Sequence, residues 1–182
     1  RNTGFVGTVN AGLQAAAGDV VILNSDTVVT AGWFDRLART AGGADVATVT
    51  PLTNEGSICT LPTDLRELFG LDGSTPDIDG AAAFIASRSP HRTPRVIAGV
   101  GFCMYVTRRA LDACGILDEA AFSPGYGEEV DFCLRATAAG FVHLVEDATF
   151  VYHEGGVSFG DDQSALLARS RQIIRERYPT FK

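Results

Sequence analysis

The sequence predicts an α/β fold in which helices flank a mixed sheet. Two short apolar runs rich in β-branched residues, Val20–Leu23 and residues 45–50, have the length and composition of core strands. Segments with apolar residues at helical spacing alternate with these runs, and Gly18 and Gly140 end two of them. Alternation of strands and helices around one sheet is typical of the α/β class.

The first half of the chain begins with a helix expected over residues 4–17. The strand at Val20–Leu23 shows no polar alternation, which predicts burial on both faces of a parallel sheet. Thr30 is expected to cap a helix over residues 32–41. Pro51 is expected to end the strand that covers residues 45–50.

Residues 51–95 are the least regular part, a variable, insertion-like region within a single domain that spans 1–182. Two short helices are expected there. A strand, a short helix and a longer helix ending before Gly140 should follow. Two short strands and a last helix capped by Asp161 complete the prediction. The expected helices of this part cover residues 64–69, 76–87, 108–114, 128–139 and 161–178, and the expected strands cover residues 102–106, 141–145 and 148–152.

Composition excludes several classes of protein. The net charge of −7 argues against a nucleic-acid-binding surface. Four cysteines without a CxxC pair suit free thiols in a reducing compartment, and no apolar run is long enough for a membrane span. We therefore predict a cytoplasmic protein. Because the chain starts at Arg1 rather than Met, the natural N-terminus is expected to precede it.

Three acidic residues, Glu128, Glu129 and Asp131, fall in the first turn of the predicted helix, directly after Gly127. A helix N-terminus favours negative charge, so these acids need no function. Glu128 and Asp131 nevertheless share a helix face, whereas Glu129 points elsewhere. Since crowded carboxylates repel, a cation or a basic substrate nearby would stabilise them.

Polar residues also end two other apolar segments, at Asn24 and Asp26 and at His153. In open α/β sheets, ligands bind at the carboxyl ends of strands. Asp26 and His153 would suffice for Mg or Mn if substrate phosphates complete the coordination. Asp26 is equally explained as a turn residue and His153 as a hydrogen-bonded loop histidine. His143 is interpreted as structural and His91 as solvated.

An ordered set of motifs resembles the family 2 glycosyltransferases of GT-A fold, over most of the chain except the middle region. The motifs are Asn2-x-Gly4-Phe5, Asn10-x-Gly12, Gly18-Asp19 with Asn24-Ser25-Asp26-Thr27, Gly101-Phe102-Cys103-Met104 with Arg108-Arg109, residues 115–119, residues 127–135, and His153 with Ser158.

The resemblance implies an inverting enzyme that transfers a sugar from a nucleotide-sugar to an acceptor hydroxyl. Asn24, Ser25 and Asp26 match the family's DXD-type motif, with Asn where Asp is frequent. Asp26 would bind Mn or Mg on the diphosphate, Asn24 and Ser25 would lie at the donor, and His153 would complete the metal shell.

The family's acidic pair matches Glu128-Glu129, with Glu for Asp at the second position. Glu129 is the expected general base, and Asp131 would bind the acceptor or orient the site. The acceptor would be a saccharide or a lipid-linked molecule in polysaccharide, cell-wall or glycolipid synthesis.

One departure concerns the start of the chain. In the family, a strand–helix–strand unit that contacts the nucleotide base should precede Arg1, and it is absent here. The chain is thus either part of an active transferase or a catalytically silent acceptor-binding or assembly module. An edge left by a missing strand predicts a homo-oligomer, and the full-length protein would associate peripherally with the inner face of the membrane.

Overall fold

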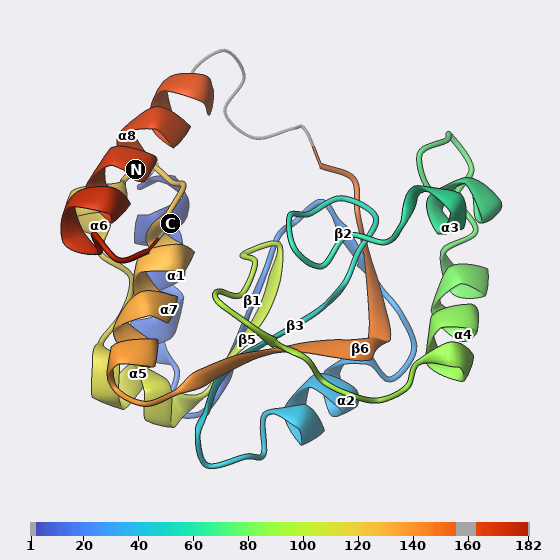
Figure 1. Cartoon of the computed structure of the whole chain (residues 1–182), viewed down its shortest axis with the longest axis horizontal. Coiled ribbons are helices and arrows are strands. Elements are labelled where there is room, and N and C mark those ends of the chain that lie inside the picture. Colours follow the sequence, from blue (N-terminus) through green and yellow to red (C-terminus); the bar gives the residue numbers. More distant parts are fainter. Residues whose placement is uncertain (1–2, 156–162, 182) are drawn as a thin grey trace.

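The computed structural model describes residues 3–155 and 163–181, which form a six-stranded mixed sheet flanked by helices (Figure 1). The strand order is β1-β5-β3-β6-β2, and β4 pairs with β6 beside this path. The elements are α1 (Gly4–Ala15), β1 (Val20–Leu23), β2 (Thr27–Val29), α2 (Trp33–Thr40), β3 (Val46–Leu52), α3 (Thr63–Leu68), α4 (Ile78–Arg88), β4 (Arg95–Val96), β5 (Cys103–Val106), α5 (Arg108–Cys114), α6 (Glu119–Phe122), α7 (Glu128–Ala138), β6 (Val142–His153) and α8 (Gln163–Arg177).

The sheet is parallel only between β3 and β6, whereas β1, β2 and β4 pair antiparallel with their neighbours. The prediction that Val20–Leu23 lies within a parallel sheet, buried on both faces, was wrong. β1 lies at one end of the strand order, antiparallel to β5, and Leu23 is 42% exposed. An unbroken apolar run of four residues does not distinguish a central strand from a terminal one.

The central strands are longer than predicted. β3 continues through Pro51, and its register with β6 shifts between Pro51 and Leu52, where the proline has no N–H to donate. Residues 141–145 and 148–152, predicted as two strands, belong to the single strand β6. Glu146 lies between the two predicted strands, and its carboxylate accepts hydrogen bonds from the Ala148 N–H and from the hydroxyl of Thr40 on α2.

Helices on both faces of the sheet bury three apolar clusters. The first joins α1, α5 and α7 to the sheet, the second packs α2 on it, and the third seats α4 near Phe150. Figure 1 places α3 and α4 on the side of the molecule opposite α7 and α8. Thr30 does not cap α2, since its hydroxyl donates to the Phe150 carbonyl and Gly32 takes the N-cap position.

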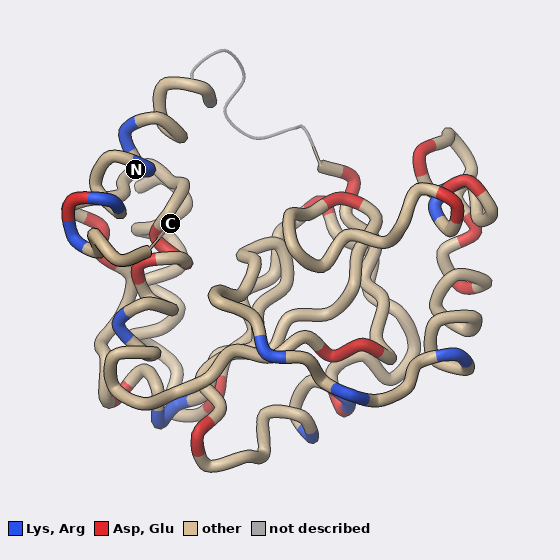
Figure 2. The backbone as a smooth tube through the Cα atoms, viewed as in Figure 1, with Lys and Arg blue, Asp and Glu red and all other residues tan. Residues whose placement is uncertain are grey.

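Charged residues of both signs are spread over the surrounding helices and loops, and the basic ones do not gather on one face (Figure 2). Acidic residues outnumber basic ones in the chain, which gives the net charge of −7. Among the helices that the structure describes, none combines the length and apolarity needed to cross a membrane.

Candidate functional site

The turn after β1 and the end of β6 meet in a first polar cluster. The short strand β2, which sequence patterns did not predict, pairs antiparallel with β6 and places Thr27 opposite His153. As a result, Oδ2 of Asp26 lies 3.4 Å from Nε2 of His153, and Nδ2 of Asn24 lies 3.5 Å from the same nitrogen. Ser25, between them in sequence, is exposed. The structure thus brings Asn24, Asp26 and His153 together, as the sequence suggested.

The orientation of the His153 ring is fixed from the opposite side. Its Nδ1 lies 2.8 Å from the Glu55 carbonyl, the Phe102 ring stacks on it at 5.3 Å, and Asn54 bonds its backbone N–H and carbonyl. A carbonyl only accepts, so Nδ1 carries the proton. In the neutral ring, the Nε2 lone pair then faces the Asp26 carboxylate. The Asn24 amide, with Nδ2 at 3.5 Å, is within long hydrogen-bond distance of this lone pair, and a cation between Nε2 and the carboxylate would bind both acceptors.

Histidine ligands of metals have this arrangement, with the second ring nitrogen donating to a carbonyl or carboxylate. Within residues 3–155 and 163–181, however, no three His, Cys, Asp or Glu side chains group closely enough to hold an ion by themselves. Asp26 and His153 would therefore supply two protein ligands at most, with Asn24 beside them, and a substrate would supply the remainder.

The first turn of α7 carries a second cluster, which follows a sharp turn of the backbone. Tyr126 and Gly127 both have left-handed conformations, with φ of 74° and 89°. This conformation costs a non-glycine residue roughly 1–2 kcal/mol. Backbone strain of this kind occurs frequently at functional sites. Here it starts α7 so that Glu128 is buried and Glu129 partly buried.

Glu128 and Glu129 form a coupled acidic pair. Burial, and next the charge of Glu129, raises the pKa of Glu128 to about 8. Burial also raises the pKa of Glu129, although backbone N–H groups and a hydrogen bond from Glu128 oppose this effect. Both carboxyl groups are therefore harder to ionise than free glutamates, and Glu128 stays largely protonated at neutral pH. One oxygen of each, Oε2, is buried without a hydrogen-bond partner among the described residues.

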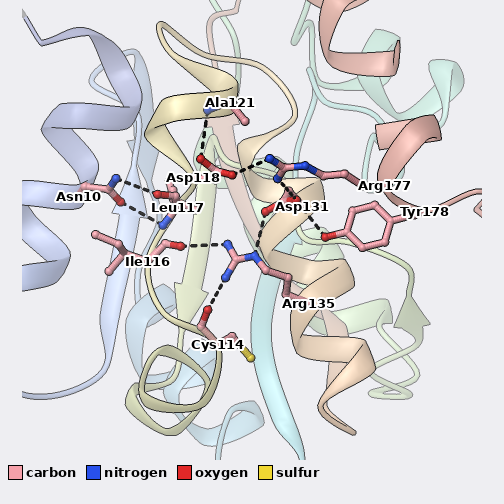
Figure 3. Close-up of polar contacts among 10 residues, drawn as sticks. All are labelled: Asn10, Cys114, Ile116, Leu117, Asp118, Ala121, Asp131, Arg135, Arg177 and Tyr178. Carbon is pink, nitrogen blue, oxygen red and sulfur yellow. Dashed lines mark hydrogen bonds and ion pairs between the residues drawn. The ribbon is translucent and has the colours of Figure 1, made fainter. Parts of the chain in front are cut away.

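Asp131, one turn further along α7, has the opposite environment. It is fully buried, and its oxygens accept from Arg135 Nε at 2.8 Å, Arg177 Nη1 at 2.9 Å and the Tyr178 hydroxyl at 2.9 Å (Figure 3). Arg177 also reaches Asp118 at 2.8 Å. Of the two roles expected for Asp131, this geometry favours orienting the site over binding the acceptor, because its oxygens are already occupied.

Sequence reasoning missed Arg177 and Tyr178, which lie 46 and 47 residues from Asp131. The i,i+4 spacing of Asp131 and Arg135 was an available signal for part of the network. Arg135 continues it to the backbone carbonyls of Cys114 and Ile116.

The segment that leads into β5 contacts both α7 and the cluster of Asp26 and His153. The Gly99 N–H donates to Cys133 Sγ on α7 at 3.3 Å. The Phe102 carbonyl accepts from the Asn24 N–H at 2.8 Å, and its ring stacks on His153. Residues 99–102 thereby link the helix that carries the acidic pair to the Asp26 and His153 cluster.

Several motif residues have structural roles. Asn10 is buried and exchanges two hydrogen bonds with the Leu117 backbone, and Arg109 donates to the Ala41 and Gly43 carbonyls. His143 is buried between Thr48 and the Cys133 carbonyl, as expected of a structural histidine, and burial lowers its pKa. His91 is exposed, as predicted. Asn2, Ser158 and Asp161 lie outside the described residues.

Comparisons with known proteins identify the fold. No protein-family model matches the sequence, and no curated protein matches it. Among solved structures, the crystal structure of GalNAc-T7 with UDP, GalNAc and Mn²⁺ is similar, with a TM-score of 0.66 and 14% sequence identity. The match covers 96% of this chain and 35% of that one, so the chain spans about a third of that protein's length. The chain therefore has the GT-A glycosyltransferase fold, as its sequence motifs predicted.

Proposed function

We propose that this chain takes part in transfer of a sugar from a nucleotide-sugar to an acceptor hydroxyl. The observation that carries the proposal is the pairing of two incomplete polar clusters on one GT-A sheet. One presents two facing acceptors, and the other presents buried carboxylate oxygens without partners. Buried polar atoms are normally satisfied, so both clusters suit a ligand. The UDP and Mn²⁺ named for the structural neighbour support a nucleotide-sugar donor and a divalent cation.

Asp26 and His153 would hold Mn or Mg at the donor diphosphate, with Asn24 and Ser25 at the donor itself. The donor set of carboxylate and imidazole fits these ions, and the Glu55 carbonyl holds the ring with Nε2 directed at Asp26. When bound, such an ion supplies Lewis-acid stabilisation of charge on the leaving diphosphate.

Glu129 is proposed as the general base. Its carboxylate would take the proton of the acceptor hydroxyl while the acceptor oxygen bonds to the anomeric carbon and the bond to the diphosphate oxygen breaks. Glu128, whose pKa is raised to about 8, would keep its proton and donate a hydrogen bond to Glu129. Glu129 and the proposed diphosphate-binding residues Asp26 and His153 belong to separate segments, which would suit attack opposite the leaving group and inversion. A shared fold does not fix this stereochemistry, so the product anomer has to be measured.

The test combines binding and turnover. Titration calorimetry with UDP and other nucleoside diphosphates, with and without Mn²⁺, should show metal-dependent binding that Asp26→Ala removes. Glu129→Gln should reduce transfer by about a thousandfold and leave donor binding intact. Glu67→Gln, at an exposed site on α3, is the matched control.

Two outcomes would change the proposal. If Glu128→Gln is inactive and Glu129→Gln active, the roles of the two acids are exchanged. If Asp26→Ala leaves metal dependence unchanged, the cation site is elsewhere.

A second candidate is a catalytically silent acceptor-binding or assembly module. Saccharide binding without metal-dependent nucleotide binding would support it over a transferase. A saccharide or lipid-linked acceptor, peripheral membrane association and a homo-oligomer remain predictions, which acceptor screening, vesicle sedimentation and light scattering would test.

A further inference from the structure

The last helix, α8, contacts α7 on both sides of the turn that bears the acidic pair. Ser170 packs against the backbone of Gly127, so closely that a Cβ at position 127 would lie 1.9 Å from Ser170 Oγ. Arg177 and Tyr178 bond Asp131. Ser170 and Arg177 are seven residues apart, two helical turns, and therefore lie on the same face of α8. Ile174, between them on that face, is buried.

The two contacted positions, Gly127 and Asp131, are also the two ends of one helical turn. The Asp131 N–H donates to the Gly127 carbonyl at 2.9 Å, which closes the turn around Glu128 and Glu129. The two glutamates repel each other when ionised, and each leaves an oxygen without a partner among the described residues. Their side chains therefore contribute little to holding their own position.

The same face of α8 reaches α6. Arg169 donates to the Ala121 and Ser123 carbonyls, and Arg177 pairs with Asp118, which caps α6 by accepting from the Ala121 N–H. Arg177 also lies 5.5 Å from the centre of the Phe122 ring. Figure 3 shows Arg177 between Asp118 and Asp131, with Tyr178 on the far side of Asp131. One side chain thus ties the C-terminal end of α8 to both α6 and α7.

We infer that α8 is a positioning element for the acidic pair, acting through Arg177, Tyr178 and Ser170. The residues do not touch the reacting atoms. They hold the first turn of α7 in register so that the Glu129 carboxylate keeps a fixed position relative to the sheet. The inference rests on the proposed function for its catalytic consequence, but not for its structural one.

The test uses Tyr178→Phe, which removes one hydroxyl and keeps the ring, and Arg177→Gln. Arg175→Gln, at an exposed position of the same helix, is the control. Carboxyl NMR titration of the full chain should show a glutamate with a pKa of about 8 in the wild type. In Tyr178→Phe this midpoint should fall towards the ordinary value, because a loosened turn admits water. Turnover should fall about tenfold in Tyr178→Phe and about a hundredfold in Arg177→Gln, with the donor KM unchanged.

Each outcome decides a separate point. If Tyr178→Phe is folded, with an unchanged glutamate titration and unchanged kcat, α8 only adds stability and the inference is overturned. If the titration shifts in a chain whose wild type transfers no sugar, the positioning role holds and the proposed function fails. If the wild type transfers sugar but the titration does not move, the proposed function holds and the inference fails.

Discussion

Three buried or partly buried carboxylates lie within one turn of α7, yet their surroundings differ. Asp131 accepts from two arginines and a tyrosine, whereas Glu128 and Glu129 have raised pKa values and each keep one oxygen without a partner among the described residues. A buried charge with a complete set of partners supports the fold, and removing it lowers the stability because its partners are left unpaired. A buried acid that lacks such partners lowers the stability of the fold, and such a residue is retained where it interacts with a ligand. The comparison separates a residue that builds the site from the residues that would act in it.

The largest expected effect is that of Asp131→Asn. The substitution removes the buried charge that pairs with Arg135 and Arg177, of which Arg177 keeps a second acidic partner, Asp118, so the free energy of unfolding should fall by about 3 kcal/mol. Urea unfolding followed by circular dichroism measures this change. A loss below about 0.5 kcal/mol would show that the network is only a surface ion pair and would remove the contrast with the glutamates.

The next effect concerns Glu128 and has a defined pH window. Its pKa rises from 4.5 to about 8 on folding, so the protonated form is favoured in the folded state. The stability that this group contributes is complete below pH 4.5 and is lost as the pH rises towards 8. Glu128→Gln should weaken this decline, leaving the part that the buried Glu129 contributes, and should exceed the wild type in stability at alkaline pH. Unfolding midpoints across this range provide the measurement, and an unchanged slope would contradict the raised pKa of Glu128.

A third prediction extends the comparison to His143, a buried histidine of β6. Burial lowers the pKa of His143 below 6.5, so its neutral form is favoured in the folded state. Its stabilising contribution is present above pH 6.5 and is lost as the pH falls below that value, because the unfolded chain then binds the proton more readily. His143→Gln should weaken the acid sensitivity of the unfolding free energy. Urea unfolding followed at a series of pH values provides the measurement, and an acid sensitivity equal to that of the wild type would contradict the prediction.

The smallest effect on stability is expected for His153→Gln. It removes one hydrogen bond to Glu55 and a ring contact with Phe102, a cost of about 1 kcal/mol. Binding of Mn²⁺ in the presence of UDP should nevertheless weaken by at least about tenfold. Thermal denaturation and calorimetry separate the two quantities. Unchanged Mn²⁺ binding would show that His153 does not contribute to the cation site.

Local sequence patterns predicted those parts of the structure whose signals lie within a few neighbouring residues. The helix at α7 followed from helix formers that end at Gly140, and the cluster of Asp26 and His153 followed from polar residues at strand ends. The pairing direction of β1 was not predictable, since four apolar residues carry no information about their neighbours. The strand β3 does not end at Pro51 as predicted, because its pairing with β6 shifts register directly after the proline. The network around Asp131 depends on residues almost fifty positions away, and no local pattern encodes that contact.

The hydrogen bond from His153 Nδ1 to the Glu55 carbonyl determines which sequence changes this loop would tolerate. A main-chain oxygen is present whichever amino acid occupies position 55, so substitutions there should preserve the tautomer of the ring. Loop length is a different matter, because inserting or deleting one residue between Asn54 and Cys59 would move the carbonyl away from Nδ1. Sequence drift at this loop is therefore expected to be free in residue type and restricted in length.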